Sequence, residues 1–90
     1  MHATFKLFIG SNNETGELEL NKIKTLSDIY FGDGFTLQEA IGYYKGTEEA
    51  TAILTVSTDE VNVLNFIHQA KITLEQESIG MIALPEMAFI

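Results

Sequence analysis

The sequence predicts an α+β domain in which two helices cover one face of a four-stranded antiparallel sheet. Four short runs alternate between apolar and polar residues, which is typical of strands. Two longer runs repeat apolar residues at helical spacing. The six runs follow one another as strand, helix, strand, strand, helix, strand. The 90 residues are enough for one domain, residues 1–90, with a small core.

The first half of the chain begins with a predicted strand at residues 3–9, where Phe5 and Leu7 alternate with polar neighbours. A polar loop follows at residues 10–16. Apolar residues then recur every three or four positions between residues 17 and 31, which predicts a helix. Glycine at positions 32 and 34 is expected to end this helix, because glycine adopts the left-handed conformation that helix ends often need.

Residues 35–44 and 49–56 are expected to form a hairpin closed by residues 45–48. In each strand, one of the two faces is more apolar than the other. The residues on these more apolar faces are Phe35, Leu37, Ile41, Tyr43, Ala50, Ala52, Leu54 and Val56. If both faces cover the core, Tyr44 and Glu49 share the opposite face. A four-residue loop would make this phenol and carboxylate cross-strand neighbours.

The second half begins with a candidate capping box, in which Ser57 caps a helix and Glu60 reaches back. The helix is expected to present one apolar stripe, made of Val63, Ile67, Ala70 and Leu74. Residues 79–84 are the last predicted strand, and Pro85 ends it. The apolar tail at residues 86–90 is expected to be an edge strand or a subunit contact.

This order of elements is the ferredoxin-like βαββαβ sandwich, in which the helices leave one sheet face open. The open face should be polar in a monomer. Alternation instead places on it Phe8, Ala40, Ile53 and Ile82, beside Thr51 and Thr55. Because soluble domains rarely expose such a patch, we expect a homo-oligomer whose sheets pack together.

Composition excludes several function classes. The net charge of −8, from 13 acids and 5 bases, argues against nucleic acid as a partner. No cysteine is present, and His2 and His68 are far apart, so we expect no disulfide and no metal site. No run is long enough to span a membrane, and residues 1–9 do not have the layout of a signal peptide. A cytoplasmic protein is expected.

Short motifs in residues 35–84 resemble the phage-encoded S-adenosylmethionine lyases, formerly called S-adenosylmethionine hydrolases. The matching elements, in order, are Gly42-Tyr43-Tyr44-Lys45, Thr47-Glu48-Glu49, Leu64-Asn65, Ala70 and Glu75-Gln76. The chain departs from that family in having fewer residues between Tyr44 and Thr47 and no long C-terminal extension. A second similarity is to an uncharacterised bacterial domain family with a Gln-Glu-Ser-Val element, here Gln76-Glu77-Ser78-Ile79.

The resemblance to the lyases implies a ferredoxin-like fold related to the PII-type regulators, and a trimer with sites between subunits. It implies cleavage of S-adenosylmethionine to methylthioadenosine and homoserine lactone, by attack of the substrate's own carboxylate and without a cofactor or metal. A phage protein of this kind would work in the host cell cytoplasm and act against methyl-dependent restriction. The alternative is a non-catalytic PII-like module that binds a small molecule or serves assembly.

By motif matching, Glu49 is the first choice for the catalytic carboxylate and Glu48 the second, and Tyr44 is expected to orient the substrate or lie near its sulfonium. Glu48 and Tyr43 are expected to bind substrate, as are Glu75 and Gln76, with Glu75 contributed by the neighbouring subunit. Each residue also has a structural interpretation. The acidic pair can be solvated acids at a hairpin end, Tyr44 an interface aromatic and Glu75 an ordinary acid at a helix end.

Overall fold

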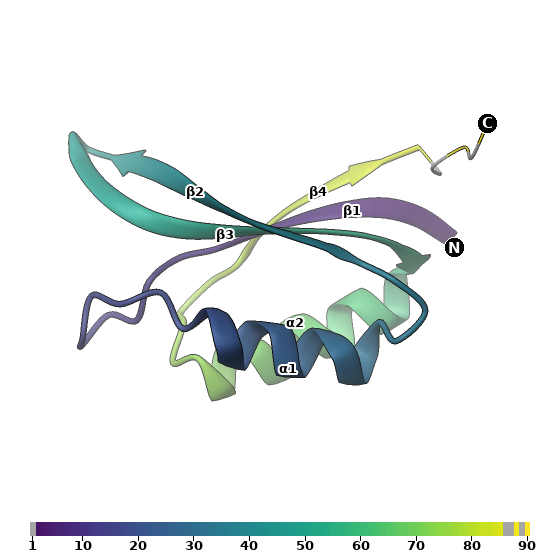
Figure 1. The fold of residues 1–90 in the computed structure, drawn as a ribbon, viewed down its shortest axis with the longest axis horizontal. Helices are drawn as coiled ribbons and strands as arrows, with labels where there is room; N and C mark the ends of the chain where they lie inside the picture. The colour runs from purple at the N-terminus through teal and green to yellow at the C-terminus, as the bar shows by residue number, and fades with distance from the viewer. Residues whose placement is uncertain (1, 86–87, 89) are drawn as a thin grey trace.

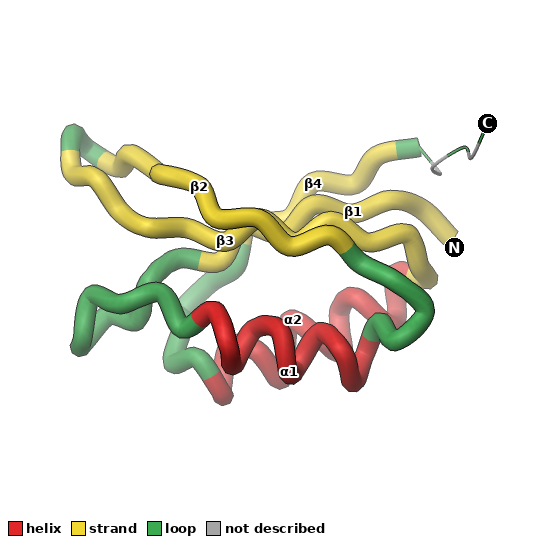
Figure 2. The backbone as a smooth tube through the Cα atoms, viewed as in Figure 1, coloured by secondary structure: helices red, strands yellow, loops and turns green. Residues whose placement is uncertain are grey.

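The computed structural model describes residues 2–85, 88 and 90, and its elements follow the predicted order (Figure 1). They are β1 (His2–Ile9), α1 (Leu20–Tyr30), β2 (Thr36–Tyr44), β3 (Thr47–Asp59), α2 (Glu60–Thr73) and β4 (Gly80–Leu84). The strands form one antiparallel sheet in the order β2-β3-β1-β4. Both helices lie on the same side of this sheet (Figure 2). The predicted ferredoxin-like fold class is therefore confirmed.

Alternation along the two central strands forms the core. In β1 and β3, Phe5 pairs with Val56 and Leu7 pairs with Leu54, and these four side chains are almost completely buried. Successive residues of a strand point to opposite faces, so this register turns every second side chain toward the helices. The buried apolar residues are Phe5, Leu7, Ile9, Ile23, Leu26, Phe31, Ala52, Leu54, Val56, Val63, Phe66, Ala70 and Leu74.

Three aromatic rings join the helix layer to this core. Phe66 of α2 is fully buried, with its ring centroid 4.9 Å from that of Phe31 and 5.8 Å from that of Tyr30. The Tyr30–Phe66 contact is edge-to-face, a favourable arrangement for two rings. The predicted apolar stripe of α2 included Ile67, but the structure buries Phe66 instead. Ile67 is only partly buried, because Phe66 continues the i, i+3 pattern from Val63.

The helix boundaries differ from the predicted ones. The first helix begins at Leu20, because residues 10–19 form a loop held by hydrogen bonds. It ends at Tyr30, and Gly32 does not have a positive φ. The capping-box prediction was wrong: β3 continues to Asp59, so Ser57 is a strand residue, 3.3 Å from Thr4 between hydroxyl oxygens. No side-chain cap hydrogen bond is formed at Asp59, the N-cap of α2.

The β2–β3 hairpin extends past the ends of the helices (Figure 1). Its turn consists of Lys45 and Gly46, with φ of 51° and 79°, and not of residues 45–48 as predicted. Two successive residues with positive φ are typical of a type I′ hairpin turn. Ile41 and Tyr43, on the face that continues the core side of the sheet, are 62 % and 70 % exposed. The prediction that they cover the core was wrong, because the helices do not reach this far.

The open sheet face carries the apolar residues that alternation predicted. Phe8 pairs with Ile53 across β1 and β3, and Ile82 of β4 pairs with Lys6 on the same face. Ile82 is 46 % exposed, and Leu84 beside it 38 %. Within the described residues, an apolar sheet face that no helix covers therefore lies opposite α1 and α2. The predicted role of the tail at residues 86–90 falls largely outside the described residues. No helix in the described part of the chain is long and apolar enough to cross a membrane.

Candidate functional site

The candidate site lies where β1 ends and the chain enters the loop of residues 10–19. Ser11 and Asn12 are each only 7 % exposed, although both are polar and lie outside any helix or strand. Burying polar groups costs free energy unless they find hydrogen-bond partners. We call this site the Ser11–Asn12 node. It consists of Gly10, Ser11, Asn12, Glu19, Glu49, Glu75 and Gln76.

Ser11 joins three parts of the chain. Its backbone N–H donates to Glu49 Oε1 at 3.1 Å, and its hydroxyl donates to the carbonyl oxygen of Ala50 at 2.7 Å. Its own carbonyl oxygen accepts from Gln76 Nε2 at 2.9 Å. The hairpin and the α2–β4 connection are therefore both fastened to the end of β1.

Asn12 organises the loop and gathers two carboxylates. Its side-chain oxygen accepts from the backbone N–H groups of Glu14 and Thr15, at 2.8 and 3.1 Å, which closes an Asx turn. Its side-chain amide donates to Glu19 Oε1 at 3.0 Å and to Glu75 Oε2 at 3.2 Å. One side-chain amide therefore forms hydrogen bonds to two carboxylates that are far apart in the sequence.

Charge at the node is only partly balanced. Lys22 Nζ lies 2.6 Å from Glu19 Oε2. This hydrogen bond, with the one from Asn12, lowers the pKa of Glu19 below its ordinary value, and the same Glu19 contact raises the pKa of Lys22. No salt bridge within the described residues includes Glu49 or Glu75.

Gly10 and Glu75 have the backbone conformations that the node requires. A Cβ atom at Gly10 would overlap Glu49 Oε1, so only glycine lets this carboxylate lie over the backbone and reach Ser11. Glu75 follows Leu74, the C-cap of α2, and has a left-handed φ of 54°, at a position where helices usually have glycine. Its hydrogen bond to Asn12 compensates part of the conformational cost.

The structure separates the predicted site residues into two groups. Glu49, Glu75 and Gln76 meet at the node. Tyr43, Tyr44 and Glu48 lie at the hairpin end instead, where the Tyr43 hydroxyl donates to Glu48 Oε1 at 3.1 Å. Lys45 Nζ lies 5.4 Å from the centre of the Tyr44 ring, within the range of a cation–π contact.

Tyr44 and Glu49 share one sheet face, but they are not opposite each other as predicted. Tyr44 pairs with Thr47, and Glu49 pairs with Gly42. The two-residue turn causes this difference, because the predicted four-residue loop would have shifted the pairing along both strands. Glu49 and Glu48 are neighbours in β3, so their side chains point to opposite faces of the sheet, and only Glu49 reaches Gly10 and Ser11.

Sequence reasoning missed Ser11, Asn12 and Glu19. A usable signal was present, because Gly10-Ser11-Asn12 follows a strand that reads as buried, and small polar residues in such a place often fold the chain back on itself. The contact between residues 11 and 49 depends on how far the hairpin extends, which alternation does not reveal.

The chemistry available at the node is that of carboxylates beside hydrogen-bond donors. Glu49 and Glu75 are exposed residues, so their carboxylates can receive an ammonium or sulfonium group from solvent. A hollow of about 470 Å³ adjoins the node and is lined by Leu18, Glu19, Leu20, Asn21 and Lys22. The described residues contain no group of three or more acids, histidines or cysteines that could hold a metal ion.

Comparison with known proteins supports the fold and leaves the family open. No family model matches the sequence, and no curated protein matches it. Among solved structures, the chain is similar to CutA1 from Oryza sativa, with a TM-score of 0.56 and 15 % sequence identity over 98 % of this chain and 84 % of that one. At this identity the likeness shows a shared fold alone. The comparisons give no support to the resemblance to phage lyases, and they support a ferredoxin-like fold for the described chain.

Proposed function

We propose that this protein is a non-catalytic, PII-like module that associates with copies of itself and binds a small molecule. The observation that supports self-association best is the uncovered apolar sheet face, where Ile82 and Leu84 are 46 % and 38 % exposed beside Phe8 and Ile53. Packing these faces together would remove apolar area from water. A trimer follows only from the resemblance given above.

The ligand class is inferred from charge. The chain has a net charge of −8, and the node presents Glu49 and Glu75. A cationic or zwitterionic molecule fits this environment better than a nucleotide triphosphate, whose phosphates would need basic partners. The absence of cysteine supports a cytoplasmic location.

Oligomeric mass tests the assembly. We expect Ile82→Glu to lower the mass in sedimentation equilibrium, because the substitution places a charge in the packed sheet faces. Ile72→Glu is the matched control, since Ile72 is 62 % exposed on α2, on the helix side. An unchanged mass for Ile82→Glu, or a wild-type chain that is monomeric at high concentration, would contradict this part of the proposal.

The second candidate is a S-adenosylmethionine lyase that needs no cofactor. One observation favours it: Glu49 and the Glu75-Gln76 pair come from separate matching motifs and lie at the same node. Glu49 would hold the substrate ammonium and turn the substrate carboxylate toward the carbon bonded to sulfur. Tyr44 would orient the substrate near the sulfonium. Positioning of this kind can lower a barrier by several kcal/mol, roughly 7–11 at the upper limit.

Incubation with S-adenosylmethionine, followed by mass spectrometry, separates the two candidates. Intact substrate together with a raised melting temperature supports the binding module. Methylthioadenosine with homoserine lactone supports the lyase, and methylthioadenosine with homoserine alone indicates hydrolysis. If product forms, unchanged turnover in Glu49→Gln would exclude the central role of Glu49. Intact substrate without a melting shift would exclude S-adenosylmethionine as the ligand.

A further inference from the structure

Three groups form a row on the open sheet face: the ammonium of Lys6, the ring of Phe8 and the carboxylate of Glu49. Lys6 and Phe8 are alternate residues of β1, and Gly10, just after the strand, continues the alternation. Gly10 has no side chain, and the Glu49 carboxylate occupies the place that a Cβ atom there would take. The open face therefore presents a cation, an aromatic ring and an anion in series along β1.

Phe8 lies at the middle of this row. Strand residues advance by about 3.3 Å each, so Lys6 and the carboxylate at Gly10 each lie roughly 7 Å from Phe8 along the strand. Phe8 pairs with Ile53 of β3, and both are half-buried apolar residues. The two charges are separated by roughly 13 Å, which is well beyond the reach of a salt bridge within one chain.

Neither charge of the row is balanced within its own chain. In the part of the chain that the structure describes, no salt bridge includes Lys6 or Glu49. Glu49 accepts the backbone N–H of Ser11, a neutral donor that leaves the negative charge uncompensated. Lys6 lies between Thr55 and Ile82, its uncharged partners on the neighbouring strands. Both charges are therefore available to a second molecule.

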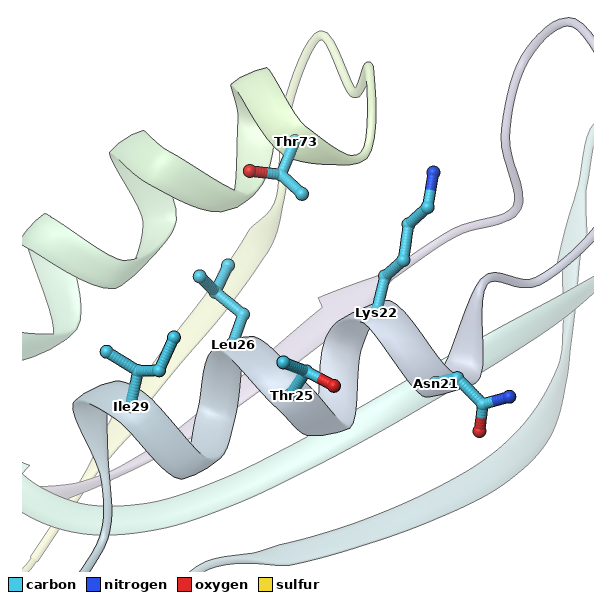
Figure 3. A pocket seen from close by; sticks show the side chains of 6 residues that line it. All are labelled: Asn21, Lys22, Thr25, Leu26, Ile29 and Thr73. Atoms are coloured by element: carbon cyan, nitrogen blue, oxygen red, sulfur yellow. The ribbon is translucent and has the colours of Figure 1, made fainter.

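The helix side of the domain differs in this respect. A groove of about 280 Å³ lies between α1 and α2, and Ile29 points across it from α1 (Figure 3). The lysines of α1 are already paired, Lys22 with Glu19 and Lys24 with Asp28. Charge therefore gives this groove no preference for a copy of the chain, whereas the row on the sheet face has two charges that can pair with those of another copy.

The row is complementary to itself. In a two-fold pair, if residue i of one copy contacts residue j of the other, then j also contacts i. A two-fold axis that lies between two facing sheets, crosses β1 at right angles and passes over Phe8 reverses the row. It places one Phe8 ring against the other and each Lys6 over the Glu49 of the facing copy. Packed sheets are about 10 Å apart, a gap that a lysine and a carboxylate from opposite sides can close.

We infer that two copies of this protein pair through their open sheet faces around a two-fold axis at Phe8, with Lys6 of each copy bound to Glu49 of the other. The inference rests on the proposed sheet-face assembly and adds its symmetry and register, which opposite charges across an interface specify. It also gives the Ser11–Asn12 node a residue from the second copy, so a cationic ligand has to displace Lys6 to reach Glu49.

Charge reversal tests the pair, because its members can be exchanged between copies. Lys6→Glu alone sets two acids opposite each other, and Glu49→Lys alone sets two lysines opposite each other. Each variant should therefore associate at least about thirtyfold more weakly than wild type in sedimentation equilibrium. An equal mixture of the two variants restores both attractive pairs, so it should form mixed dimers with an affinity within about tenfold of wild type.

Lys71→Glu is the matched control. It makes the same change of charge on α2, on the helix side, where Lys71 is exposed and the described residues give it no salt bridge. It should leave the affinity of the dimer unchanged, alone and in a mixture with Glu49→Lys it should restore nothing. Circular dichroism confirms that each variant is folded, because Glu49→Lys also removes the acceptor of the Ser11 N–H.

A cysteine at Ile53 provides a second measurement that leaves both charges in place, since the chain has no cysteine of its own. Ile53 lies beside Phe8, so across the axis it faces its own counterpart. Thr55, two residues along the same face of β3, should be roughly 13 Å out of line with its counterpart. With a short bis-maleimide, Ile53→Cys should give at least about five times as much cross-linked dimer as Thr55→Cys.

The outcomes separate this pair from the assembly on which it rests. A mixture that associates no better than the separate variants, or equal cross-linking at Ile53 and Thr55, would overturn the pair. If Ile82→Glu still lowers the mass, the sheet-face assembly then stands without it. A wild-type trimer would also overturn the two-fold axis and leave that assembly standing. A wild-type chain that is monomeric at high concentration would remove both.

Discussion

The carboxylate of Glu49 accepts a hydrogen bond from the backbone N–H of Ser11, 38 residues earlier in the chain, at 3.1 Å. This bond joins the protruding hairpin to the segment that directly follows the central strand β1. It also fixes the direction of the carboxylate that motif matching singled out as catalytic. Gly10 permits the contact, because any side chain there would occupy the space of the Glu49 carboxylate.

Replacing Gly10 by alanine should destabilise the protein through Glu49. The new Cβ would displace the carboxylate and leave the Ser11 N–H without its acceptor, a cost of about 1–2 kcal/mol. In a Glu49→Ala background there is no carboxylate to displace, so the same substitution should cost at least about 1 kcal/mol less. Denaturant unfolding of the four proteins measures this coupling.

Gly80→Ala is the matched control for that cycle. A Cβ at Gly80 would lie 3.5 Å from Phe8 Cβ, an ordinary contact. Its effect should be small and additive with Glu49→Ala. Equal costs of Gly10→Ala in both backgrounds would show that Glu49 does not lie over Gly10 in solution.

The left-handed backbone at Glu75 gives a second prediction. Glu75→Gly and Glu75→Ala both remove the hydrogen bond to Asn12, but only alanine retains the strain of a φ of 54°. We expect the glycine variant to be more stable than the alanine variant by about 1 kcal/mol, measured by denaturant unfolding. An alanine variant as stable as the glycine variant would contradict the left-handed conformation.

Phe66 should be among the most sensitive core positions. Its side chain is fully buried and contacts the rings of Tyr30 and Phe31, so Phe66→Ala should leave a cavity and cost about 3–5 kcal/mol. Ile72→Ala on the same helix is the control and should change stability by less than about 0.5 kcal/mol, because Ile72 is 62 % exposed. Similar unfolding midpoints for the two variants would contradict the position of Phe66 in the core.

The contacts of Glu19 predict that the stability of the folded protein depends on pH. Hydrogen bonds from Lys22 and Asn12 hold the pKa of Glu19 below its ordinary value. These bonds therefore stabilise the folded state fully at a pH above the ordinary pKa of a glutamate. The stabilisation is lost as the pH falls through the lowered pKa. The difference in urea midpoint between wild type and Glu19→Gln should therefore shrink between about pH 6 and about pH 3. A difference that stays constant over this range would show that the contact does not form.

The fold class was predictable because the elements are specified locally. Alternation in residues 3–9 and 49–56 and helical spacing around Ile23 and Val63 each act within a few residues of the chain. The open-face residues Phe8, Ile53 and Ile82 also followed from parity alone. The predicted capping box at Ser57 failed because pairing of β3 with β1 extends the strand to Asp59, and pairing between distant strands overrides a local cap signal.

The candidate site was only partly predictable. Motif matching named Glu49, Glu75 and Gln76, but it also named Tyr43, Tyr44 and Glu48, which the two-residue turn keeps at the far end of the hairpin. Ser11 and Asn12 have no distinctive motif. Their importance comes from contacts with residues much later in the sequence, at 38 and 63 positions along the chain.

The sequence by itself therefore determined the order of the elements, the inward and outward faces of each strand, and the acidic character of the surface, since all three depend on residue type and short-range spacing. Only the tertiary structure decided where the hairpin turns, which acids meet at the Ser11–Asn12 node, and that the helices stop short of Ile41 and Tyr43. These features depend on strand register and on the relative lengths of elements. Both are set by packing between parts of the chain that are far apart in sequence.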